Sequence, residues 1–369
     1  MSNKHITIKE LNNEGVYDTL YPNTSATQVP LSAATSQLFG QTGLNTDVAL
    51  YKIIEKLRAD KKITVRVTDS NGNPVQGAKI NGLLNSPTTG ANGTVTGVFV
   101  SDPLTIVSPY VDVQDGTANG ADYVGTLNVL EVVLQAEADN TIFRYTSSTN
   151  VKFSPAVSTI DVCCVGGGGG GGGCDKGLSY SQAAGGGGGG GIVNSMNLAI
   201  TANQSYNIII GAGGNSGSIV DEDWYSGING SQGGTSSFGL LVQANGGEGG
   251  KYIRGDYAGG VAGATGCGNG GKGADLRIGT GNNGSSNTTI SEFNDNITFY
   301  SGGGGSGGAE GGSPNGASGA TATDDAKLAE TGGGGGGAYL WVNNAQTTYR
   351  VHTGSKGGNG LVAIRVHLK

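Results

Sequence analysis

Residues 159–173 read TIDVCCVGGGGGGGG, an apolar segment that runs directly into eight consecutive glycines. Three more unbroken tracts follow at 185–191, 302–305 and 332–337, in a chain with 73 glycines among its 369 residues. A flexible linker normally mixes glycine with serine and lies between domains. These tracts instead lie within one region and have apolar neighbours, for example at 208–210 and 338–342. The pattern therefore predicts that the glycines belong to an ordered structure.

Ordering eight glycines in a row is costly, because glycine loses more backbone entropy than any other residue. We expect extended left-handed threefold helices of the polyproline type, which rise about 3.1 Å per residue without internal hydrogen bonds. Without Cβ atoms such helices approach closely, and a parallel stack pairs their amides with their carbonyls. A tract of eight then spans roughly 25 Å, with loops at both ends of the stack. Disorder is the alternative, whereas collagen is excluded because it needs strict triplets and more proline than the 8 residues present.

Length and composition limit the classes of protein to consider. The length suggests two or three domains, and 36% hydrophobic with 13% charged residues fits neither one large core nor a charged disordered chain. A net charge of -7 and a pI near 5.0 argue against a nucleic acid partner. No apolar run is long enough to span a membrane, and the N-terminus lacks the apolar stretch of a signal peptide. We therefore expect synthesis in the cytoplasm.

The candidate metal ligands do not form a metal-binding pattern. The spacing of the four cysteines does not match a zinc site, so we expect buried thiols, with a metal site or a disulfide as alternatives. Residues 69–73 resemble the start of a calcium loop, but the glycine at its sixth position and the glutamate at its twelfth are missing. This segment is predicted to be a turn, and no cofactor is expected. The cysteines are Cys163, Cys164, Cys174 and Cys267.

Residues 1–61 are predicted to be a separate N-terminal region that mediates oligomerisation. The segment 45–47 offers the N-cap of a helix that continues to about Ala59. Its single apolar stripe is too small to form a core alone. We expect it to associate with copies of itself as a trimer, the alternative being that it packs on a neighbouring domain. The stripe consists of Leu50, Ile53, Ile54 and Leu57.

The rest of the chain is predicted to be mainly β, in two further domains. Residues 62–135 form a small β-sandwich, with strands expected at 63–68, 78–80, 93–100, 104–111 and 127–134. Residues 136–369 form a glycine-rich domain, in which packed polyglycine helices extend from a β-framework. Framework strands are expected at 141–145, 151–153 and 159–165, with a hairpin at 198–210. The alternating closing strand, 361–368, suits a half-buried edge of a sandwich.

Several segments of the last domain together resemble the glycine-rich domain of bacteriophage tail-fibre and receptor-binding proteins. The polyglycine stack is similar to that of the adhesins at the tips of T-even-like phage long tail fibres. The chain departs from those adhesins in its additional N-terminal modules and in its fewer, less regular tracts. The segments are LAITANQSYNIIIGAGG (198–214), GGTSSFG (233–239), GGGGSGG (302–308), TGGGGGGAYLW (331–341) and GGNGLVAIRV (357–366).

Two earlier segments extend the resemblance. YPNTSATQVPLS (21–32), followed by the early helix, is similar to the attachment region of tail proteins from phages of Gram-positive hosts. VTDSNGNPVQGAKI (67–80) is similar to immunoglobulin-like and carboxypeptidase-regulatory-like modules. Some animal receptors share the polyglycine feature, but their extracellular domains need a signal peptide.

The sequence offers little for catalysis. It has three histidines, His5, His352 and His367, and no G-x-S-x-G motif beside an apolar strand with suitable partners. Acidic residues cluster at 221–223 and 324–325, but a glycoside hydrolase holds two carboxylates at a set separation across a rigid cleft. We expect no enzyme, with a cell-wall glycan depolymerase as the alternative.

Recognition by loops is the function that we expect, because binding residues concentrate on loops held by a rigid scaffold. Aromatic side chains beside acids and amides suit sugars, and aromatic residues and arginine also anchor protein interfaces. For Trp341, together with Tyr339, the alternative is a strand that only caps the stack. The predicted receptor-binding residues are Trp224, Tyr225, Tyr252, Arg254, Asp256, Tyr257 and Trp341.

The resemblance and the loops together predict a trimeric receptor-binding protein of the phage virion. Residues 1–61 would attach it to other tail or baseplate proteins, and the sandwich would act as a spacer. Loops of the glycine-rich domain would bind a glycan or protein of the bacterial surface, with multivalency strengthening weak contacts. The alternative is a structural fibre or baseplate component whose glycine-rich domain only builds a stiff tip.

Overall fold

The computed structural model describes the following residues: 8–11, 17–20, 61–173, 181–218, 228–252, 274–275, 282–285, 290–292, 297–299, 316–318, 332–342 and 349–369. These residues are mainly β, which confirms the predicted fold class. The chain divides into two compact units, Met1–Ser108 with Asp115–Gln135 and Pro109–Gln114 with Ala136–Lys369. The helix predicted within residues 45–59 lies outside the described residues.

The first unit contains two three-stranded sheets, and a separate antiparallel pair is formed by β1 (Ile8–Leu11) and β2 (Tyr17–Leu20). In one sheet β3 (Lys62–Asp69) pairs antiparallel with β5 (Thr94–Val98) and parallel with β8 (Val129–Leu134). In the other, β6 (Leu104–Val107) lies between β4 (Lys79–Asn81) and β7 (Gly116–Ala118), which precedes the short 3-10 helix η1 (Ala121–Tyr123).

The turn predicted after β3 is confirmed by its hydrogen bonds. The Asp69 carboxylate accepts the backbone N–H groups of Asn71 and Asn73 at 2.9 and 2.8 Å. Its second oxygen accepts the side-chain amide of Asn73 at 3.0 Å. The carboxylate therefore stabilises the turn as an Asx motif, which is a structural role.

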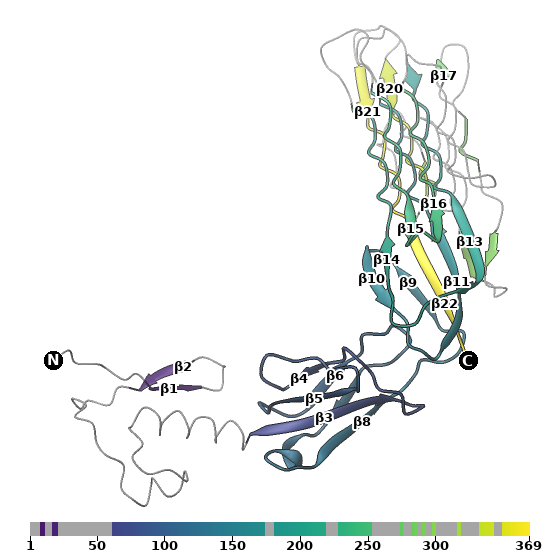
Figure 1. Ribbon diagram of the computed structural model, residues 1–369. Coiled ribbons are helices and arrows are strands. Elements are labelled where there is room, and N and C mark those ends of the chain that lie inside the picture. The colour runs from purple at the N-terminus through teal and green to yellow at the C-terminus, as the bar shows by residue number, and fades with distance from the viewer. Residues whose placement is uncertain are drawn as a thin grey trace, which may run out of the picture. The chain divides into compact units, whose positions relative to one another are not determined.

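Two four-stranded antiparallel sheets form the framework of the second unit (Figure 1). Their inner faces share an apolar core in which the Phe238 ring stacks on Tyr206 at 5.0 Å and meets Phe153 edge-on at 6.3 Å. The first sheet has the order β13 (Ile192–Ala199), β11 (Val157–Val165), β22 (Leu361–Leu368), β9 (Ile142–Tyr145); the second has β10 (Thr149–Lys152), β14 (Ser205–Ile209), β15 (Ser236–Phe238), β16 (Val242–Ala244).

Two predictions about the framework are wrong. The closing strand β22 is not a half-buried edge, because it pairs with β11 on one side and β9 on the other, and residues 361–366 are all buried. Residues 198–210 are not a hairpin within one sheet. The chain crosses there from β13 in the first sheet to β14 in the second, through a turn in which Asn203 has a φ of 64°.

A third four-stranded sheet lies at the far end of the glycine-rich unit (Figure 1). Its order is β17 (Ala274–Asp275), β12 (Gln182–Ala183), β20 (Tyr339–Val342), β21 (Tyr349–His352), and all its pairs are antiparallel. A further antiparallel pair is formed by β18 (Ile290–Glu292) and β19 (Ile297–Phe299).

Seven described glycine-rich tracts run between the framework and this third sheet (Figure 1). We number them in chain order: 1 (166–173), 2 (185–191), 3 (211–218), 4 (228–234), 5 (245–251), 6 (332–338) and 7 (353–360). Tract 1 is at their centre. The N–H of Gly166 donates to tract 2, that of Gly167 to tract 4 and that of Gly168 to tract 7, and this rotation repeats every three residues to Gly173. The carbonyls of tract 1 accept from tracts 3, 5 and 6. The period of three is that of a polyproline-type helix.

The six outer tracts bond to one another in a closed ring, in the order 3, 4, 5, 2, 6, 7. Tracts 3, 5 and 6 run parallel to tract 1, whereas tracts 2, 4 and 7 run antiparallel to it, so that neighbours in the ring alternate in direction. The predicted parallel stack is therefore wrong in direction. The chain has to return to the framework after each outward pass, and the returning tract packs beside an outgoing one.

Glycine is required in tract 1 by close approach and not by backbone dihedral angles. A Cβ on Gly169 would lie 1.9 Å from the carbonyl oxygen of Glu248, and one on Gly170 would lie 2.0 Å from that of Asn215. The other six positions give contacts of 2.4 Å or less, and none of the eight has a positive φ. Any side chain would thus force the neighbouring tracts apart.

Candidate functional site

The end of the stack away from the framework is here called the tip. At the framework end most tracts run straight into strands: β11 enters tract 1, tract 2 enters β13, β16 enters tract 5, and tract 7 enters β22. The opposite ends of the tracts, among them Gly173, Ser218 and Ile228, lie together with the third sheet (Figure 1). The sequence predicted loops at both ends. Among the described residues, short turns between strands join tract 2 to tract 3 and tract 4 to tract 5 at the framework end, whereas the segment that leads into tract 6 lies outside the described residues.

Most of the predicted binding residues lie outside the described residues, and their chain neighbours are at the tip. Trp224 and Tyr225 fall between Ser218, which ends tract 3, and Ile228, which begins tract 4. Arg254, Asp256 and Tyr257 follow closely after the end of tract 5. Because tract 4 lies between tracts 3 and 5 in the ring, the segments that bear these residues start from adjacent positions.

Tyr252 is the described member of this group. It is half-buried, and its backbone N–H donates to the side-chain oxygen of Asn229 at 3.0 Å. This bond ties the end of tract 5 to the start of tract 4. Sequence reasoning did not identify Asn229, although it stands directly before the glycine of an Asn-Gly pair, shortly after Trp224 and Tyr225 in the sequence.

The backbone of Trp341 follows a different tract from those that flank the other candidates. It lies in β20, directly beyond tract 6, where its backbone pairs with Arg350 of β21. Tract 6 is on the opposite side of tract 1 from tract 4. In the same strand, burial raises the pKa of Tyr339 above its ordinary value. The backbone of residues 339–342 therefore forms a strand at the end of the stack, which is the alternative given above for Tyr339 and Trp341.

A buried amide lies within the third sheet. Gln182 of β12 is fully buried, and neither its side-chain nitrogen nor its side-chain oxygen has a hydrogen-bond partner in the described structure. Its Cα partners are Asp275 of β17 and Leu340 of β20, and Leu340 belongs to a small apolar cluster with Ala184, Ala338 and Val342. A buried amide without hydrogen bonds lowers stability.

Replacing Gln182 by methionine, a side chain of similar length, is expected to stabilise the glycine-rich unit by about 1 kcal/mol. The reason is that the variant has no amide to desolvate. Thermal unfolding of the full chain checks this as a rise in Tm. Gln243→Met at an exposed position of β16 is the matched control and is expected to leave the Tm unchanged. A lower Tm for Gln182→Met would show that the amide contributes to stability.

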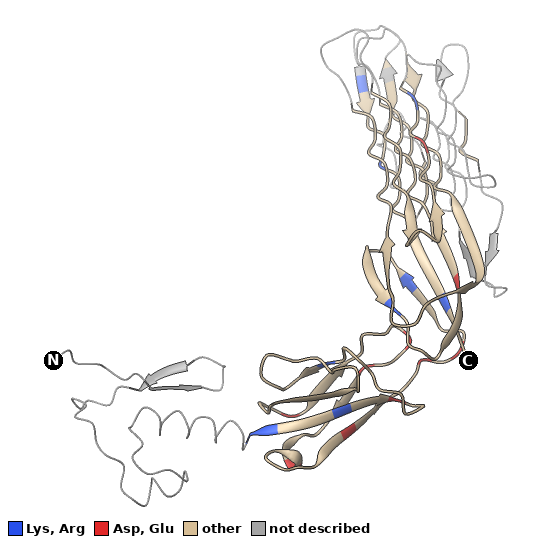
Figure 2. Ribbon diagram, viewed as in Figure 1, with Lys and Arg blue, Asp and Glu red and all other residues tan. Residues whose placement is uncertain are grey.

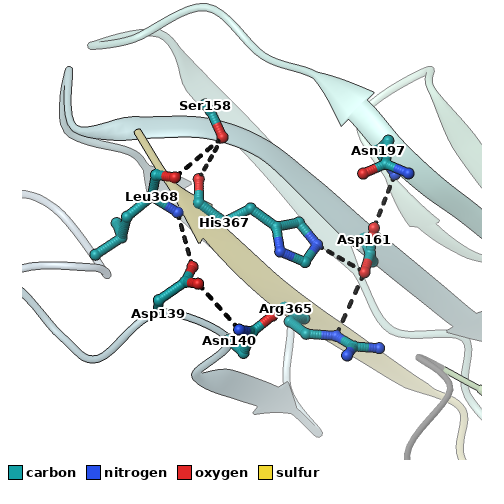
Figure 3. A network of polar contacts seen from close by, with 8 residues as sticks. All are labelled: Asp139, Asn140, Ser158, Asp161, Asn197, Arg365, His367 and Leu368. Atoms are coloured by element: carbon teal, nitrogen blue, oxygen red, sulfur yellow. Dashed lines mark hydrogen bonds and ion pairs between the residues drawn. The ribbon is translucent and has the colours of Figure 1, made fainter.

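A network of buried polar groups lies at the framework (Figure 3). Asp161 of β11 accepts a hydrogen bond from His367 at 2.8 Å and pairs with the Arg365 guanidinium at 3.3 Å. Its other oxygen accepts the N–H of Asn197 at 2.8 Å. The Asp161 side chain is 2% exposed and that of Arg365 8%. The carboxylate thus links its own strand, β11, to two others, β22 and β13.

This network is a structural clamp of the framework. Opposite Asp161 the pairing of β11 with β13 shifts register, and Asn197 has a φ of 52°. At this bulge the carboxylate accepts the hydrogen bond that the Asn197 N–H donates. Its ion pair with Arg365 compensates the two buried charges. The sequence signal for this role is an acidic residue inside the otherwise apolar strand 159–165.

Charged residues are sparse on the described tracts (Figure 2). Among the described residues no group of three or more His, Cys, Asp or Glu side chains is placed to hold a metal ion. No helix in that part of the chain has the length and hydropathy that a membrane crossing needs. Cys163 and Cys164 are buried thiols, as predicted, whereas Cys174 and Cys267 lie outside the described residues.

Comparison with known proteins gives one family match. The model of a family described as a glycine-rich domain matches residues 144–367, which is more than half of the chain. This range begins in β9, ends in β22 and contains all seven tracts. A search of curated proteins finds no match. On the strength of the family match and of the stack that it spans, the chain belongs to this glycine-rich domain family.

Proposed function

We propose that this protein is a bacteriophage receptor-binding protein that binds a glycan or protein of the bacterial surface through loops at the tip. One observation carries the proposal: the ring of tracts brings the flanks of the aromatic segments 219–227 and 253–257 to adjacent positions at one end of a stack. Loops on such a rigid scaffold are where binding residues concentrate. The candidate residues in these segments, together with Tyr252 directly before the second, are Trp224, Tyr225, Tyr252, Arg254, Asp256 and Tyr257.

The rest of the proposal concerns assembly. Residues 1–61 attach the protein to other tail or baseplate proteins of the virion and hold it as a trimer, and the sandwich at 62–135 acts as a spacer. Several copies then engage the surface together, which raises the overall affinity well above that of one tip. The resemblance of the N-terminal segment 21–32 to attachment regions of phage tail proteins supports this arrangement.

The test is binding of the fluorescently tagged full chain to a panel of bacterial strains. We expect binding to some strains, and a loss of at least about tenfold in affinity when Trp224 and Tyr252 are both changed to alanine. Leu240→Ala is the matched control, because Leu240 is 93% exposed in the turn between β15 and β16 at the framework end. That variant should bind like the unchanged protein.

Three outcomes would contradict the proposal, the third of them only its binding site. If the folded, multivalent protein binds no strain although assembled particles still need it, the protein is a structural component of the fibre or baseplate. If purified protein releases reducing sugar ends from cell-wall material, it is a depolymerase. If the double alanine variant binds as tightly as the unchanged protein, the binding site does not lie in the segments named above, although the protein does bind bacteria.

A further inference from the structure

Tracts 7, 3, 4 and 5 follow one another around the exposed part of the ring. On tracts 3, 5 and 7 a side chain stands at every third residue, mostly with buried glycine between. We name these sets by their first residue: the 212 row, the 245 row and the 353 row. They consist of Ala212, Asn215 and Ser218; Asn245, Glu248 and Lys251; and Thr353, Lys356 and Asn359, all exposed except for the half-buried Lys251.

Enclosed tracts have a different sequence. Tracts 1 and 2 are glycine at every position, tract 6 differs only in its last residue, Ala338, and every residue of the three tracts is buried. The composition of a tract thus follows its surroundings. In the three tracts that are buried throughout, every residue except Ala338 is glycine; on tracts 3, 5 and 7 the exposed positions are ones that keep a side chain.

Bare glycine on an exposed face would be a template for further tracts. The ring shows that such helices add laterally by direct N–H to carbonyl bonds, in the way that an exposed strand edge recruits another strand. A Cβ prevents this packing, since at the eight positions of tract 1 it would approach a neighbouring tract to within 2.4 Å or less. The exposed rows place such a Cβ at every third residue.

The side chains also occupy backbone donors. The Asn359 side-chain oxygen accepts the N–H of Gly213 at 3.0 Å, across the groove between tracts 7 and 3. Asn229 does the same for Tyr252 between tracts 4 and 5. In both grooves a side chain supplies the acceptor that the carbonyl of one more tract would otherwise provide.

We infer that the 212, 245 and 353 rows close the edge of the stack and keep copies of this protein from joining through their glycine tracts. The partner that the bared face would fit is a second copy of this chain, whose tracts have the same period and the same donors. This property is independent of what the tip binds.

The test compares two variants of the full chain. In the glycine variant all six residues of the 212 and 353 rows become glycine; in the alanine variant they become alanine, with Ala212 unchanged. Both lose the polar groups, but only the first loses the Cβ atoms. Sedimentation at increasing concentration should give the glycine variant a mass that roughly doubles relative to the unchanged protein. The alanine variant should keep the mass of the unchanged protein.

Two results would overturn the inference. One is a folded glycine variant, verified by resistance to protease, whose mass equals that of the unchanged protein at every concentration. The other is equal association of the alanine variant, which would assign the effect to lost polarity. If the six changes prevent folding, the same comparison is made with the 212 row alone changed to glycine or to alanine. In that glycine variant the exposed face of tract 3 lacks Cβ atoms, while the 353 row is unchanged.

Discussion

Alanine at Gly170 is expected to destabilise the glycine-rich unit by about 3 kcal/mol or more. The added Cβ would lie 2.0 Å from the carbonyl oxygen of Asn215, which is backbone and cannot swing away. Moving tract 3 outward would also strain the bonds of its neighbours, since the ring is closed. Thermal unfolding of the full chain, followed by protease digestion, measures the loss.

Two further alanine variants calibrate the effect of Gly170→Ala. At Gly234 the nearest atom would be 2.9 Å from the new Cβ, so an intermediate loss is expected. At Gly90 in the first unit the nearest contact is an ordinary 3.5 Å, and its φ is not positive, so alanine there should be neutral or slightly stabilising. Wild-type stability of Gly170→Ala would mean that tract 1 is not enclosed by six neighbours.

Alanine at Asp161 is expected to cost about 3–5 kcal/mol, because it leaves the buried Arg365 guanidinium without its carboxylate. The Asn197 N–H at the bulge loses its acceptor as well. Denaturant unfolding of the full chain measures the change in the free energy of unfolding. The effect is large because the side chains of Asp161 and Arg365 are only 2% and 8% exposed.

An exposed ion pair of the same chain provides the control. Arg66 and Glu131 lie 3.7 Å apart with side chains that are 47% and 55% exposed, so Glu131→Ala should change stability by about 0.5 kcal/mol at most. Replacing Asp161 and Arg365 together by leucine should recover much of the loss, since no buried charge then lacks a partner. Similar small losses for Asp161→Ala and Glu131→Ala would show that the network does not stabilise the framework.

Local patterns predicted the elements of this fold better than its pairings. The alternation in 361–368 and the apolar run in 159–165 identify β22 and β11, because strand formation there follows from neighbouring residues. The place of β22 in its sheet depends on β11 and β9, which are far away in sequence. For the same reason the chain segment 198–210 looked like a hairpin although its two halves belong to different sheets.

The tracts show a similar limit. Unbroken glycine identified tracts 1, 2 and 6, whereas 302–305 lies outside the described residues. Tracts 3, 4, 5 and 7 were not recognised, because side chains interrupt their glycines, as in NGGEGGK at 245–251. These interruptions have meaning only when the neighbours of each tract are known, since exposure decides which residue of three keeps a side chain.

The candidate site was predictable only in part. Apart from Tyr252 and the backbone of Trp341, its residues lie outside the described part of the chain and stay predictions. The separation of Trp341 from tract 4 follows from the ring order, which no local pattern encodes. Asn229 and Gln182 were missed because single amides carry no signal until their partners, or the lack of partners within the described residues, are known.

The rotation of hydrogen bonds around tract 1 also restricts how the length of this protein can change. Inserting one residue into a tract would turn every later N–H toward the wrong neighbour, whereas inserting three would restore the rotation. Three extra residues lengthen a threefold helix by about 9.3 Å, and the whole ring has to lengthen together to stay paired. Related proteins should therefore differ in stack height by whole steps of three residues, while the connections at the tip are free to vary in length and sequence.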